Sequence, residues 1–118
     1  MTIDRDVLRD VWNRAAAREG TGVGDRHLGT LLLVDGMLHN GGASLAVDSC
    51  EPAEIAAAAD AARYFGLDDL AVVIEGIPAA DDEDDFNDAF FEAGRDGEAI
   101  NDAFEARYAA APGDFDPV

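Results

Sequence analysis

Hydrophobic residues recur at intervals of three and four along most of this chain. In residues 4–18, Val7, Leu8, Val11 and Trp12 have this spacing, which predicts an amphipathic helix with one buried stripe. The same pattern predicts helices over 86–93 and 98–108, and denser apolar positions predict a central helix over 26–39. An acid and an early proline, Glu51 and Pro52, precede an alanine-rich run and predict a helix over 53–65.

Two short apolar runs, 30–34 and 68–77, would suit a buried strand as well as a helix, because so short a run has no decisive period. We favour a helix for the first because its apolar positions continue to Leu38 without enrichment in β-branched residues. We favour a helix for the second because its connection to the preceding helix is short. The chain is therefore expected to be all-α.

The predicted architecture is a single compact domain of about six helices over residues 1–110, with an acidic C-terminal third and a tail at 111–118. A turn at Asn40, Gly41 and Gly42 is expected to end the second helix, because Asn and Gly tolerate the left-handed conformation. The predicted core contains Leu31, Leu32, Val34, Leu38, Ile55, Phe65, Ile74, Phe90 and Phe104.

The charge of the chain is strongly negative. Its 118 residues include eight Arg, no Lys and 26 acidic residues, a net charge of −18, while 48% hydrophobic residues suffice for a folded domain. Direct binding to nucleic acid or to an anionic membrane is not expected, because those surfaces are bound by Arg and Lys. The acids are densest in residues 81–118, which hold thirteen of them and two Arg.

The sequence also predicts a cytoplasmic location. A single cysteine, Cys50, cannot form an internal disulfide, and residues 1–10 are charged where a signal peptide would be apolar. The longest apolar run, 31–34, is far too short to span a bilayer, so no membrane segment is expected.

Candidate catalytic and metal chemistry is weak. The acidic run 81–85 has carboxylates at calcium-loop positions, but Phe86 stands where the loop needs glycine, so no metal site is expected. His27 and His39 lie in no metal or catalytic spacing, and neither Ser44 nor Ser49 has a nucleophile-elbow motif. Without any Lys, the glycine-rich 20–24 does not indicate a phosphate loop. We expect no catalytic residues and no cofactor.

The acidic surface is the remaining candidate site. Its carboxylates are predicted to replace nucleic-acid phosphates in charge-assisted hydrogen bonds to Arg and Lys of a basic protein surface, such as a DNA-binding protein or a nuclease bound by an immunity protein. The predicted partner-binding residues are Asp81, Asp82, Glu83, Asp84, Asp85, Asp88 and Glu92.

Two alternatives stay open at this point. One is a small-molecule-binding or enzymatic domain with a pocket near the turn, lined by His39, Asn40 and Asp35. The other is a salt-adapted domain that has no special charged site. An even spread of acids over every face would favour the second alternative.

The stretch 31–42, LLLVDGMLHNGG, resembles the Asn-Gly-Gly signature of the DNA-mimic-like family, a bacterial family of unknown function. The run Arg63 to Gly66 and the stretch 100–108, INDAFEARY, are similar to later segments of that family, although Ala43 stands where members have an aromatic residue. The resemblance implies an all-helical fold without catalysis. It also implies a homodimer that mimics duplex DNA to sequester a DNA-binding protein, as one kind of member does.

Overall fold

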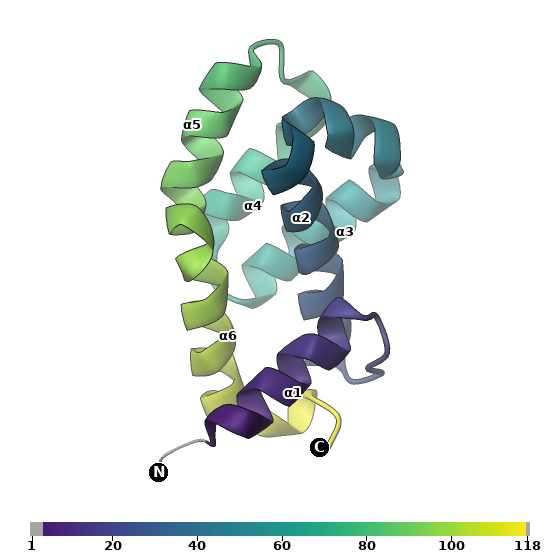
Figure 1. Ribbon diagram of the computed structural model, residues 1–118, viewed down its shortest axis with the longest axis vertical. Helices are drawn as coiled ribbons and strands as arrows, with labels where there is room; N and C mark the ends of the chain where they lie inside the picture. Colours follow the sequence, from purple (N-terminus) through teal and green to yellow (C-terminus); the bar gives the residue numbers. More distant parts are fainter. Residues whose placement is uncertain (1–3, 118) are drawn as a thin grey trace.

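The fold is all-α in the computed structural model, which describes residues 4–117 (Figure 1). No strand occurs within that range. Its six α-helices are α1 (Arg5–Ala16), α2 (Val23–Ser49), α3 (Pro52–Tyr64), α4 (Asp68–Glu75), α5 (Glu83–Gly94) and α6 (Glu98–Ala110). Three 3-10 turns accompany them, η1 (Ile77–Ala79), η2 (Arg95–Gly97) and η3 (Pro112–Asp114). Both segments that could have been strands are helical, in α2 and α4.

The molecule is elongated, with extents of 45 × 24 × 20 Å, and α2 packs against α1, α3 and α5 (Figure 1). Leu28, Leu31 and Val34 of α2 are fully buried, so this helix supplies the middle of the core. Helices α5 and α6 follow one another along one side of the molecule. The α1 helix and the C-terminus lie together at the end opposite the start of α5.

The predicted core is largely correct. Eight of its nine residues are buried, and the exception is Leu32, which is half-buried and packs on the edge of the core. The predicted core left out the alanine-rich side of α3, where four alanines are buried against α2 and α4. These are Ala58, Ala59, Ala61 and Ala62.

The predicted turn at Asn40, Gly41 and Gly42 lies at a kink where two helical runs of α2 meet. Asn40 and Gly41 remain helical, and only Gly42 leaves the helical region, at φ 71° and ψ −162°. Helix then resumes through Ser49. The first helical run therefore ends at Gly42, as the turn predicts, but a second run follows at once instead of a loop. A carboxylate of α5 accepts a backbone N–H of this second start.

Residues 111–117, predicted to be a tail, pack onto the domain. Phe115 is only 4% exposed, and its ring lies 5.6 Å from that of Phe104 and 5.4 Å from that of Tyr108. Gly24 of α2 lies directly beneath it, since a Cβ built at Gly24 would come within 2.6 Å of the Phe115 ring. The segment beyond α6 is therefore part of the core.

Candidate functional site

The acidic run forms the ordered start of α5. Asp82 is the N-cap residue, and its carboxylate accepts hydrogen bonds from the backbone N–H groups of Asp84 (2.9 Å) and Asp85 (3.1 Å). The acids of the first turn, Glu83 to Asp85, also interact favourably with the positive end of the helix dipole. The run is therefore a helix start instead of a disordered loop.

Opposite sides of α5 have opposite chemistry. Phe86, Phe90 and Gly94 are buried against the core. All seven predicted partner-binding residues are exposed. Because residues three and four apart lie on one side of a helix, Asp84, Asp85, Asp88 and Glu92 share one side of α5. Together with exposed Asp81, which precedes the helix, they are called the acidic face of α5.

Glu83 points elsewhere and serves the fold. Its Oε1 accepts a hydrogen bond of 2.8 Å from the backbone N–H of Ser44, the second residue after the Gly42 kink. This hydrogen bonding to Ser44 lowers the pKa of Glu83. Glu83 thus caps the resumed part of α2 from a different helix. With Asp82, it is the part of the predicted partner site that the fold itself uses.

Charge is distributed unevenly along the molecule. Residues 1–26 contain five arginines and five acids, whereas residues 27–94 contain fifteen acids and one arginine. That arginine, Arg63, is paired with Glu75. Residues 95–118 carry a net charge of −4, so most of the net negative charge lies in the segment from α2 to α5, and seven of its fifteen acids lie in 81–92.

A groove of about 810 Å³ runs between α4 and the α5–α6 junction. Its apolar lining includes Leu70, Val72, Val73, Ala89 and Ala93. Its charged lining is three acids, Asp68, Asp69 and Glu92, and one arginine, Arg95. Glu92 also belongs to the acidic face of α5, so the groove borders that face.

Two of the three residues predicted to line a pocket near the turn, Asp35 and His39, pair with one another, and Asn40 is exposed. His39 Nε2 lies 3.4 Å from Asp35 Oδ2, and the imidazole packs edge-on against Phe90 and Phe91. Burial raises the pKa of Asp35. A cavity of about 300 Å³ does lie beside the kink, lined by residues of 43–48 and 77–80. Its lining includes none of Asp35, His39 and Asn40.

An aromatic and ionic cluster joins α2, α3, α6 and η3, and sequence reasoning missed it. His27 stacks on Tyr64 at 4.4 Å, and the Arg107 guanidinium lies 4.2 Å from the centre of the same ring. Tyr64 Oη donates a hydrogen bond of 2.6 Å to Asp114 Oδ2. Burial raises the pKa of Tyr64 and lowers that of His27, while the Tyr64 hydroxyl lowers the pKa of Asp114. The four residues lie too far apart in the chain for any spacing rule to connect them.

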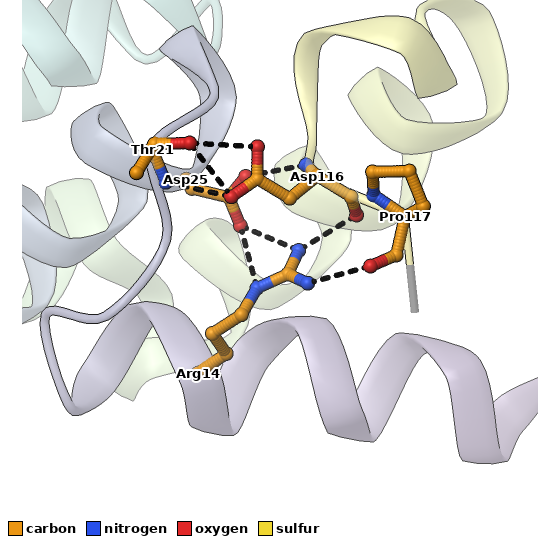
Figure 2. Close-up of polar contacts among 5 residues, drawn as sticks. All are labelled: Arg14, Thr21, Asp25, Asp116 and Pro117. Atoms are coloured by element: carbon orange, nitrogen blue, oxygen red, sulfur yellow. Dashed lines mark hydrogen bonds and ion pairs between the residues drawn. The ribbon is translucent and has the colours of Figure 1, made fainter.

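A second network, drawn in Figure 2, fastens the C-terminal segment. The Asp25 side chain is fully buried; its Oδ1 accepts hydrogen bonds from Arg14 and its Oδ2 accepts one of 2.6 Å from the backbone N–H of Asp116. Thr21 donates to the Asp116 carboxylate through its backbone and its hydroxyl, and Arg14 donates to the carbonyls of Asp116 and Pro117.

The glycine-rich loop 20–24 is the sequence signal for this network. A Cβ at Gly20 would lie 2.4 Å from the Asp25 side chain, and one at Gly22 would lie 2.5 Å from the Asp114 carbonyl oxygen. The glycines are there because the C-terminal segment and Asp25 approach the loop backbone closely. Neither this network nor the aromatic cluster opens onto the acidic face of α5.

Metal and membrane chemistry have little structural basis in the described chain. Among the side chains that the structure describes, no three of His, Cys, Asp or Glu are grouped so that they could hold a metal ion. No helix within residues 4–117 combines the length and apolarity needed to cross a bilayer. Cys50 is buried, and burial raises the pKa of its thiol.

Comparison with known proteins adds no relative: no family model, curated protein or solved structure matches this chain. The resemblance to the DNA-mimic-like family therefore stays a prediction from three short stretches of sequence.

Proposed function

We propose that this chain is a non-catalytic interaction module that binds a basic protein surface through the acidic face of α5. The partner that fits best is a protein whose basic surface normally contacts nucleic acid, either a DNA-binding protein or a nuclease. Its Arg and Lys side chains would make charge-assisted hydrogen bonds to the α5 carboxylates. The field around α5 would also speed the encounter.

The observation that carries this proposal is the spacing of carboxylates on an ordered helix. Asp84, Asp85, Asp88 and Glu92 are exposed on one side of α5. At 1.5 Å per residue they occupy about 12 Å of helix axis, or about 4 Å between neighbours. One strand of duplex DNA carries one phosphate per ~3.4 Å of helix axis. A basic groove built for that strand would meet a similar density of negative charge.

The uneven charge also favours an interaction site over a hydration coat. A coat adapted to salt would distribute acids over every face, as noted above. Here residues 1–26 have no net charge and residues 27–94 have a net charge of −14. Concentrated like charge destabilises the free protein through self-repulsion, which a basic partner would relieve.

The test is affinity capture from native cell extract across a salt series, with three forms of the protein. The α5-neutralised variant carries Asp81→Asn, Asp84→Asn, Asp85→Asn, Asp88→Asn and Glu92→Gln. The control variant loses the same number of exposed charges elsewhere, through Asp6→Asn, Asp10→Asn, Glu19→Gln, Asp60→Asn and Glu98→Gln. Asp82 and Glu83 are left intact because the fold uses them.

We expect the native form and the control variant to retain a basic protein at low salt and to release it as salt rises. The α5-neutralised variant should retain little of it. Recovery of no basic protein by the native form at low salt would contradict the proposal. So would equal recovery by the α5-neutralised and native forms, since binding would then lie elsewhere.

A further inference from the structure

We propose that the groove between α4 and the α5–α6 junction, called here the α4–α5 groove, receives a basic amphipathic helix of the partner. This inference rests on the proposed function and adds to it a second contact surface. Carboxylates alone supply attraction at long range, whereas the apolar floor of a groove supplies shape and buried area. The groove would therefore decide which basic proteins are bound.

The floor of the α4–α5 groove suits the apolar side of a helix. Val72 is 63% exposed, the highest exposure among the large hydrophobic residues of the described chain, and it lies on α4 in the groove. Ala89 and Ala93 face it from α5. Small residues let a helix backbone approach closely, and an exposed valine offers an apolar side chain for a partner to bury.

The rim of the groove sets the charge of the occupant. Asp68 and Asp69 lie at its α4 side, Glu92 lies at its α5 side, and the only basic lining residue is Arg95. Arg95 is already paired with Asp102, at 3.0 Å. Asp85 precedes Ala89 and Glu92 on the same side of α5 and extends the acidic rim. An apolar helix flanked by Arg or Lys complements this arrangement, and an acidic or neutral helix does not.

Val72→Glu gives a test in which shape and charge predict opposite results. The probe is a synthetic peptide of Ala, Leu and Arg whose Leu residues repeat at helical spacing, compared with a scrambled peptide of the same composition. If attraction were purely electrostatic, the added carboxylate would tighten binding of both peptides. If the groove receives the apolar side, Val72→Glu should weaken binding of the amphipathic peptide by about tenfold. Val47→Glu, at an exposed valine on α2, is the matched control.

Fluorescence anisotropy at low salt measures the binding of each peptide, and three results would support or overturn the proposed groove. Tighter binding of the amphipathic than the scrambled peptide, lost in Val72→Glu and kept in Val47→Glu, supports it. Equal binding of both peptides, tightened by Val72→Glu, overturns the groove while the proposed function stands. Binding of neither peptide counts against both.

A second copy of this chain is the competing occupant. Sedimentation of the protein alone distinguishes it from a partner helix. A monomer supports the groove as a partner site. A dimer that Val72→Glu dissociates overturns the proposal, because the groove would then be filled by the chain itself.

Discussion

Asp25 Oδ1 accepts hydrogen bonds from two nitrogens of Arg14, at 2.8 Å from Nη2 and 3.2 Å from Nε. The Asp25 side chain is fully buried, and Arg14 is four-fifths buried. Because Asp25 also accepts the backbone N–H of Asp116, this pair joins α1, the start of α2 and the C-terminal segment (Figure 2). It fixes the end of the molecule opposite the start of α5.

Asp25→Asn should strongly destabilise the protein. The substitution leaves the Arg14 guanidinium largely buried without its counter-charge, and breaking such a pair lowers the free energy of unfolding by about 3 kcal/mol. Chemical denaturation followed by circular dichroism measures this difference. Arg5→Gln is the control, because it removes an ion pair to Glu105 whose arginine is exposed, and it should change stability by less than about 1 kcal/mol. Equal effects of the two substitutions would contradict the assignment.

Phe115→Ala tests whether the C-terminal segment is part of the core. Removing this buried ring leaves a cavity beside Phe104 and should lower the free energy of unfolding by about 3 kcal/mol. Phe91→Ala removes a ring that is 47% exposed and should cost less than about 1 kcal/mol. The same denaturation experiment compares them. A tail detached from the domain would make Phe115→Ala the milder of the two.

Two glycines of α2 should respond to alanine with opposite signs. Gly42 has φ 71° and ψ −162°, a region open essentially to glycine alone, so Gly42→Ala should cost about 1–3 kcal/mol. Gly36 lies within the same helix with open space around its Cβ position, so Gly36→Ala should stabilise by about 0.5–1 kcal/mol. Thermal unfolding of both variants checks the kink. Stabilisation by Gly42→Ala would show that α2 runs straight through.

Glu83→Gln should reduce stability in a pH-dependent way. Hydrogen bonding to Ser44 lowers the pKa of Glu83 below its ordinary 4.5 in the folded state. The resulting stabilisation is complete above the unfolded pKa and is lost as pH falls through the lower folded pKa. The difference in melting temperature between the native form and Glu83→Gln should therefore be largest at neutral pH and shrink below about pH 4.5.

Glu92→Gln is the control for this pH series. Glu92 lies exposed on the same helix, within the acidic face of α5. Its neutralisation should leave stability unchanged or raise it slightly at neutral pH, because it reduces repulsion among the α5 acids. If the melting temperature of Glu83→Gln depended on pH in the same way as that of Glu92→Gln, the capping role of Glu83 would be contradicted.

The helices were predictable because their signals are local. Three-and-four spacing fixed α1 and α6 within a few residues, and a proline after an N-terminal acid marked the start of α3 at Pro52. The kink was not predictable, because Gly42 ends one helical run and Glu83, forty-one positions later, starts the next. A local sequence rule can predict the left-handed glycine, but it cannot predict the distant carboxylate that caps the second helical run.

The candidate site was predictable in composition and only partly in role. Charge density identified residues 81–92, and helical geometry places four of their carboxylates on one side of α5. Helical geometry could not show that Glu83 caps α2 at Ser44 or that Asp68 and Asp69 join Glu92 around a groove. The buried Asp25 was hidden for the same reason, since its partners lie at both ends of the chain.

The central claim is that the partner binds to the acidic face of α5. Its most direct test is to measure, at low salt, the dissociation constant of the captured basic partner for three forms: native, α5-neutralised variant and control variant. Loss of five favourable charge pairs, each contributing about 0.3–0.5 kcal/mol, predicts at least tenfold weaker binding for the α5-neutralised variant. The control should stay within about threefold of the native form, because its removed charges lie away from the acidic face of α5. Equal weakening of the two variants would mean that net charge alone attracts the partner, and would contradict a binding site on α5.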